Sequence, residues 1–77
     1  MSNLPVISSR ECIRALEKAG FYVERQKGSH IIMVRDEPPP SLTIVVPNHK
    51  ELKKGTLRTI IRQSGLTVDE FKNLLKK

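Results

Sequence analysis

The sequence predicts an α+β fold in which one helix precedes a three-stranded antiparallel sheet and a second helix follows it, the order αβββα with a short terminal helix. Apolar residues recur at helical spacing near both ends of the chain and approach strand-like alternation between them. The length of 77 residues suffices for one small domain, which we expect to span residues 1–77, and excludes a separate cofactor module. Short connections favour antiparallel strands, with both main helices on one face of the sheet.

The first helix is expected to begin after Ser8, because Ser8 and Glu11 have the spacing of a capping box. Apolar residues then recur at helical spacing as far as Ala19, and Gly20 supplies a C-terminal stop. Cys12 falls within this apolar band and is interpreted as a small core residue. As the single cysteine of the chain, it also excludes an internal disulfide.

The middle of the chain predicts three strands. Residues 21–26 alternate between two faces, and residues 27–29, Lys-Gly-Ser, form a tight turn. Residues 30–35 are a nearly continuous apolar strand, and the three prolines at 38–40 predict a loop because proline cannot donate a ladder hydrogen bond. Residues 42–47 alternate again and form the third strand, which stops at its proline.

From Asn48 the pattern returns to helix. Leu57 begins an apolar i, i+3, i+4 set, and Gly65 ends the helix. Thr67 and Glu70 form a second capping box, which predicts a short third helix at the end of the chain.

Basic residues outnumber acidic ones, with 14 Lys and Arg against 8 Asp and Glu and a formal net charge of +6. The excess is uneven: residues 48–77 contain eight basic and three acidic side chains, whereas residues 1–47 contain six and five. Such a positive field favours a polyanionic partner such as nucleic acid. The alternative is an ordinary basic surface that keeps a small protein soluble.

Several classes of protein are excluded by what the sequence lacks. No apolar run approaches the roughly 18 residues of a membrane span, and residues 1–5 lack the pattern of a signal peptide, so we expect a cytoplasmic protein with no membrane partner. There is no cysteine pair for zinc, no HExxH motif and no glycine-rich phosphate loop. We therefore expect neither a metal nor a cofactor.

His30 is the sharper of the two histidine candidates for proton transfer. It follows the turn directly, where Lys27 could neutralise phosphate charge and Ser29 could hydrogen-bond a phosphate oxygen. This neighbourhood suits a phosphodiester substrate. The alternative is a histidine that simply begins a strand, and simple alternation places it on the face of Ile32 and Val34, which would turn it toward the core.

A second group of candidates surrounds the start of the second main helix. His49 lies in the connection that precedes the helix and is either a second proton carrier or an exposed loop residue. The amides at the helix N-terminus would suit phosphate, and the dense positive charge favours contacts to a nucleic-acid backbone. The RNA-binding candidates of this group are Lys53, Lys54, Thr56 and Arg58.

Blocks of sequence in a specific order resemble the HicA family of toxin ribonucleases from toxin–antitoxin pairs. The blocks cover most of the chain. They are residues 17–21 (EKAGF), 25–30 (RQKGSH), 46–49 (VPNH), 51–58 (ELKKGTLR) and 65–71 (GLTVDEF).

The resemblance implies a fold like the double-stranded-RNA-binding domain, an endoribonuclease activity that cleaves mRNA, and His30 as the catalytic residue. It also implies a HicB-type antitoxin that masks this histidine and inhibits the toxin. We expect the reaction to need no metal, since His30 and nearby lysines can supply its acid–base and electrostatic chemistry. Residues 36–41 depart from the shorter connection typical of the family. The alternatives are a non-catalytic RNA-binding module of the same fold and a subunit whose basic face meets only an acidic antitoxin.

Overall fold

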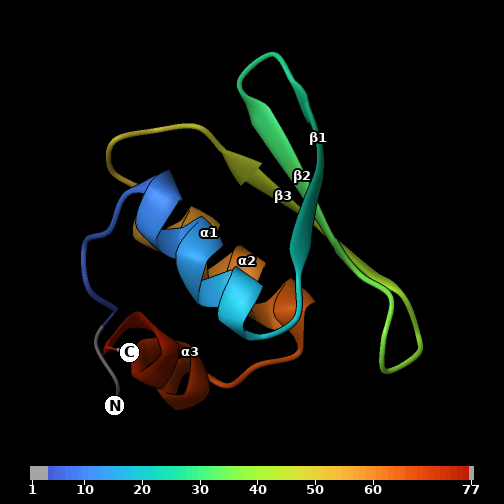
Figure 1. Cartoon of the computed structure of the whole chain (residues 1–77). Coiled ribbons are helices and arrows are strands. Elements are labelled where there is room, and N and C mark those ends of the chain that lie inside the picture. The colour runs from blue at the N-terminus through green and yellow to red at the C-terminus, as the bar shows by residue number, and fades with distance from the viewer. Residues whose placement is uncertain (1–3, 77) are drawn as a thin grey trace.

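The computed structural model describes residues 4–76 and confirms the order αβββα with a third helix at the end (Figure 1). Residues 1–5, which we expect not to be a signal peptide, lie mostly outside the described residues. In chain order the elements are α1 (Ser9–Lys18), β1 (Tyr22–Lys27), β2 (His30–Arg35), β3 (Leu42–Pro47), α2 (Lys54–Ser64) and α3 (Val68–Lys76).

The three strands form one antiparallel sheet in the order β1-β2-β3, and the helices lie on one side of it (Figure 1). Met33 of β2 pairs with Ile44 of β3, and Ile31 pairs with Val46, so these four side chains face the helices together. We call this side of the sheet the inner face and the opposite side the outer face. The helices contribute mainly Cys12, Ala15, Leu16, Leu57, Ile60, Ile61 and Phe71 to the same core.

Helix ends follow the expected signals. Ser8 caps α1 reciprocally with Glu11, whose carboxylate accepts from the Ser8 backbone N–H at 3.0 Å. Thr67 and Glu70 make the second capping box, in which the Glu70 carboxylate accepts from the Thr67 backbone N–H at 2.8 Å. Gly65 ends α2 with a φ of +79°, a left-handed conformation that glycine adopts without a steric penalty.

The alternative in which His30 turns toward the core does not occur: its side chain shares a face with Ile32 and Val34, as the alternation predicts, but this is the outer face, where His30 is exposed. Both faces of β2 carry apolar side chains, so either face could have packed on the helices. The helices cover Ile31 and Met33 rather than Ile32 and Val34. Val34 is nevertheless buried, although it lies outside the main core cluster. A run of consecutive apolar residues gives no alternation from which the core side can be read.

The expected connection before the second main helix extends over residues 48–53. Backbone hydrogen bonds hold this loop against other segments. The Leu52 N–H donates to the Ile7 carbonyl at 2.8 Å, and the Leu52 side chain is buried in the core. Helix α2 starts only at Lys54.

Candidate functional site

The closed end of the β1–β2 hairpin brings two of the predicted site residues together. Lys27 and His30 are cross-strand partners, and only Gly28 and Ser29 connect them. Gly28 has a φ of +59°, which favours glycine at this tight turn. Directly opposed residues on one face of an antiparallel pair have Cβ atoms about 5 Å apart. Lys27 and His30 are therefore neighbours on the outer face, and both are exposed.

A β-bulge in β1 gives Lys27 this orientation. The pairing register shifts between Val23, opposite Met33, and Arg25, opposite Ile32, so that Glu24 is the extra residue. Strict alternation from Tyr22 would turn Lys27 toward the inner face, away from His30. The extra residue reverses the alternation, as bulges beside functional sites often do.

The loop after β3 fixes the turn from the other side. The Asn48 backbone N–H donates to the Ser29 carbonyl at 2.7 Å, and Pro47 is the cross-strand partner of His30. The Ser9 backbone N–H donates to the His49 carbonyl at 3.0 Å, and the Ser9 hydroxyl donates to the Asn48 side-chain oxygen at 3.2 Å. These bonds join the hairpin end to the first turn of α1. His49 is exposed, and its carbonyl takes part in this anchoring.

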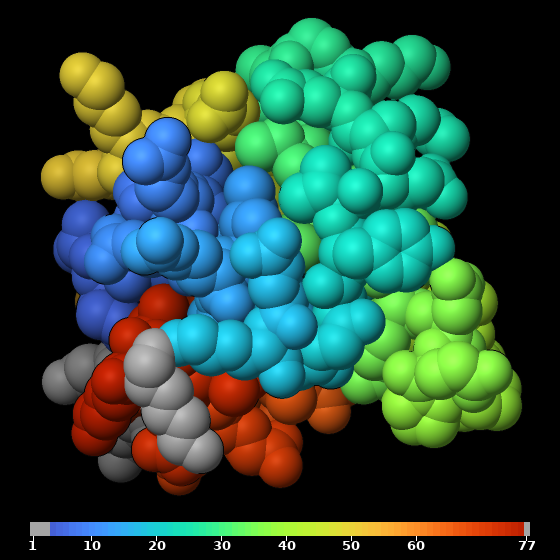
Figure 2. Space-filling model, in the orientation of Figure 1, coloured from blue at the N-terminus to red at the C-terminus, as the bar shows by residue number. Residues whose placement is uncertain are grey.

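A shallow groove lies on the inner side of the hairpin end, between the hairpin and α1. Figure 2 shows the surface hollowed between the blue helix α1 and the teal strand β1. Arg10 and Arg14 line it from α1, and Gln26 lines it from β1. Sequence reasoning missed these residues, because nothing in their spacing relates the exposed side of α1 to the hairpin. Ser9, Ile13, Glu17, Ile31 and Asn48 complete the lining.

The remaining RNA-binding candidates gather at the start of α2. Lys53 is the N-cap residue, and within the described chain no side chain caps the first turn of this helix. The first backbone N–H groups of α2 therefore have no side-chain acceptor in that part of the chain, and they lie beside Lys54 and Thr56. The first turn also contains no acidic residue. Arg58 follows one turn later and, with Arg62, lines a shallow groove along α2.

The structure separates the candidates into two groups. The hairpin end contains Lys27, Ser29 and His30, and His49 lies in the loop after β3. The remaining candidates cluster at the start of α2: Lys53, Lys54, Thr56 and Arg58. Figure 1 shows these two places well apart, with the olive loop 48–53 running from β3 to α2 between them. The two groups can therefore contact different phosphates of one chain, but we do not expect both at a single phosphate.

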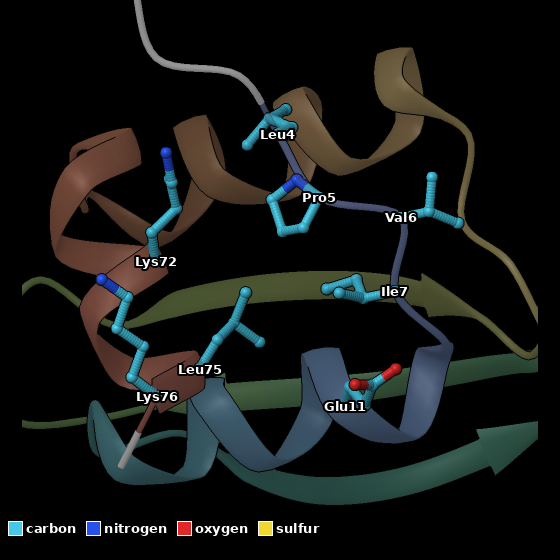
Figure 3. Close-up of a pocket in the computed structure, with 8 residues that line it drawn as sticks. All are labelled: Leu4, Pro5, Val6, Ile7, Glu11, Lys72, Leu75 and Lys76. Carbon is cyan, nitrogen blue, oxygen red and sulfur yellow. The ribbon is translucent and has the colours of Figure 1, made fainter.

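A further hollow lies at the opposite end of the molecule, between the N-terminal segment and α3 (Figure 3). Leu4, Ile7 and Leu75 give it an apolar lining, and Lys72 and Lys76 stand along one side. None of the predicted site residues lines it.

Within residues 4–76, Cys12 and the acidic side chains form no second candidate site. Burial raises the pKa of the Cys12 thiol to about 12, so that this side chain stays protonated, as the core interpretation requires. Within residues 4–76 no three His, Cys, Asp or Glu side chains cluster as metal ligands would. Each helix of that range is also too short or too polar to cross a membrane.

Comparison with known families gives one clear match. A family model described as the HicA toxin of bacterial toxin–antitoxin systems matches residues 9–66, about three quarters of the chain. The matched range begins at the first residue of α1 and continues beyond α2, so it includes the hairpin end and the start of α2. None of the curated proteins compared with the chain matches it significantly. On the family match, the chain belongs to the HicA toxin family.

Proposed function

We propose that the chain is the toxin of a toxin–antitoxin pair and a metal-independent endoribonuclease that cleaves mRNA and thereby inhibits translation. The main support is the pairing of Lys27 with His30, both exposed on the outer face at the hairpin end. An imidazole can transfer a proton near neutral pH, and an ammonium group neutralises phosphate charge. Family membership adds support, because HicA toxins are mRNA interferases, and it implies an antitoxin partner, for which a HicB-type protein is the candidate.

In the proposed reaction the ribose 2′-oxygen attacks the adjacent phosphorus and the bond to the 5′-oxygen breaks. His30 takes the 2′-hydroxyl proton or gives a proton to the leaving 5′-oxygen. Lys27 neutralises the charge that develops on the phosphate, and the Ser29 hydroxyl donates to a phosphate oxygen. The products are a 2′,3′-cyclic phosphate and a 5′-hydroxyl.

One imidazole cannot remove a proton and donate one in the same step, so a second carrier is needed. The candidates are Lys27, which faces His30 across the hairpin, and His49, which lies two residues beyond Pro47, the partner of His30. The geometry favours Lys27, because its proximity follows from the strand register. His49 lies on an exposed loop and would have to turn toward the hairpin.

The group at the start of α2 is proposed to bind the RNA backbone away from the cleaved bond. Lys53, Lys54 and Arg58 supply positive charge, while Thr56 and the uncapped amides supply hydrogen-bond donors. If about four phosphates of a single strand are neutralised in total, the logarithm of affinity falls with the logarithm of salt concentration at a slope of roughly −3. A flat salt response would exclude this role.

The products of RNA cleavage test the proposal. The purified chain is incubated with a long RNA in EDTA, and the ends of any fragments are identified. We expect fragments with 2′,3′-cyclic phosphate and 5′-hydroxyl ends. Fragments with 5′-phosphate and plain 3′-hydroxyl ends contradict the mechanism. RNA that is bound but never shortened supports the non-catalytic RNA-binding module instead.

A further inference from the structure

The outer face presents three cross-strand rows of side chains that the helices leave uncovered. Six of the nine side chains are exposed, and the inward-facing residues that form the core lie on the other face. Val34 is the one buried member. From the open end of the hairpin to its turn, the rows are Tyr22–Val34–Thr43, Arg25–Ile32–Val45 and Lys27–His30–Pro47.

We propose that a single-stranded RNA lies along this outer face, with Arg25 and Tyr22 as contacts beyond the cleaved bond. The proposal rests on the proposed function, since it places the reacting phosphate at Lys27 and His30. Arg25 then binds the neighbouring phosphate, and the ring of Tyr22 stacks on a base further along. Past the hairpin end, the strand can continue over loop 48–53 toward the start of α2.

Charge favours a polyanion on this face. Its ionisable side chains include the cationic Arg25 and Lys27, as well as His30, and none of the nine positions is acidic. Glu24 pairs with Arg25 at 3.1 Å, and both side chains lie at the surface, where water screens the pair. Exposed ion pairs contribute little free energy, so a phosphate can replace this carboxylate as the partner of Arg25.

The spacing of the cations fits an extended strand of RNA. Arg25 and Lys27 both follow the bulge and are two residues apart in β1. Their side chains therefore project from the same face, at positions about 7 Å apart along the strand. This is close to the separation of adjacent phosphates in an extended single strand. Without the bulge at Glu24, neither side chain would share the face of His30.

Tyr22 supplies an aromatic side chain at the far end of the face. It is 44% exposed. Its hydroxyl donates to the Asp36 carboxylate at 2.8 Å, and Asp36 also accepts from the Ser41 hydroxyl at 3.2 Å. The hydrogen bond to Asp36 raises the pKa of the Tyr22 phenol, which therefore stays neutral. An anchored, neutral ring suits base stacking, which tolerates any sequence because every base has an aromatic face.

The test measures binding of the complete chain to a short fluorescent single-stranded RNA whose riboses are 2′-O-methylated, so that the blocked 2′-oxygen cannot attack. Arg25→Gln is expected to raise Kd several-fold and to reduce the salt slope by about 0.7, the share of one phosphate. Tyr22→Ala is expected to raise Kd by about tenfold, and Tyr22→Phe to bind as the unmodified chain does. Arg14→Gln, in the groove on the other side of the hairpin, is the matched control and should leave Kd and slope nearly unchanged.

Three results overturn the proposal. If Arg14→Gln weakens binding while Arg25→Gln does not, the RNA lies along α1 instead. If all outer-face variants bind RNA normally but lose affinity for the purified antitoxin, the face docks a protein. If they bind RNA normally while His30→Ala still abolishes cleavage, the RNA path is wrong and the proposed function stands. A chain that neither binds nor cleaves RNA refutes the proposed function itself.

Discussion

Replacing Asn48 with alanine removes a hydrogen bond between segments far apart in the sequence. The Ser9 hydroxyl donates to the Asn48 side-chain oxygen at 3.2 Å, and Ser9 is only 5% exposed. Once the acceptor is gone, water in the groove that Ser9 and Asn48 line can replace the lost bond only in part. The Asn48 backbone N–H still donates to the Ser29 carbonyl, because alanine retains it. The substitution thus breaks the side-chain bond between the loop and α1 and leaves the contact to the hairpin.

The expected loss of stability follows from the unpaired hydroxyl. A buried polar group that loses its partner costs about 1–3 kcal/mol. In a domain of this size, each kcal/mol lowers Tm by about 4–8 °C, so the Tm of Asn48→Ala should fall by roughly 4–24 °C. A chain of 77 residues has a total stability of about 4–12 kcal/mol, so most of the variant should remain folded at room temperature.

Thermal unfolding followed by circular dichroism measures this effect in Asn48→Ala, Ser9→Ala and the double variant. Ser9→Ala should cost less, because the Asn48 side chain that it leaves unpaired is exposed to water. The double variant should be no less stable than Asn48→Ala, since it contains no unpaired hydroxyl. Asn73→Ala, on the exposed side of α3, is the control and should change Tm little. Strictly additive losses from the two single substitutions would refute this reasoning.

Four further substitutions and a thiol reaction test local features of the fold. Ser8→Ala should lower the free energy of unfolding by about 1 kcal/mol in urea titrations, because it destroys the capping box of α1; an unchanged midpoint would contradict this. Gly28→Ala should destabilise by about 1–2 kcal/mol because φ is +59° at the turn, although open space surrounds the position. Gly55→Ala, in the helical conformation of α2 and also in open space, should stabilise by about 0.5–1 kcal/mol, and equal effects of the two glycine substitutions would contradict the conformational argument. The raised pKa of Cys12, about 12 against 9.0, predicts that a thiol reagent at pH 8 reacts only with unfolded chain. Above about pH 9 the unfolded chain loses the thiol proton while the folded chain keeps it, so stability should fall toward pH 12, and this part of the fall should be absent in Cys12→Ala.

Much of the fold could be predicted because its signals are local. The two capping boxes and the glycine after α2 depend on residues a few positions apart, and each forms as expected. The strands are bounded by a turn and by prolines that lie in the sequence itself. His30 and Lys27 could be singled out for the same reason, since a lysine, a turn and a histidine are consecutive in the chain.

The relation between these residues could not be predicted, because it depends on contacts across the fold. The face of His30 is decided by which residues of an apolar run the helices cover. The bulge at Glu24, which turns Lys27 toward His30, has no evident signature in the sequence. The bond between Ser9 and Asn48 joins positions 39 residues apart.

The cleavage rate of a long RNA in EDTA, compared among the unmodified chain, His30→Ala and His49→Ala, tests the central claim most directly. Circular dichroism must first show that all three proteins are folded. We predict that the unmodified chain cleaves the RNA, that His30→Ala does not, and that His49→Ala retains most of the activity, because Lys27 rather than His49 faces His30. Equal cleavage by the unmodified chain and His30→Ala would contradict the account.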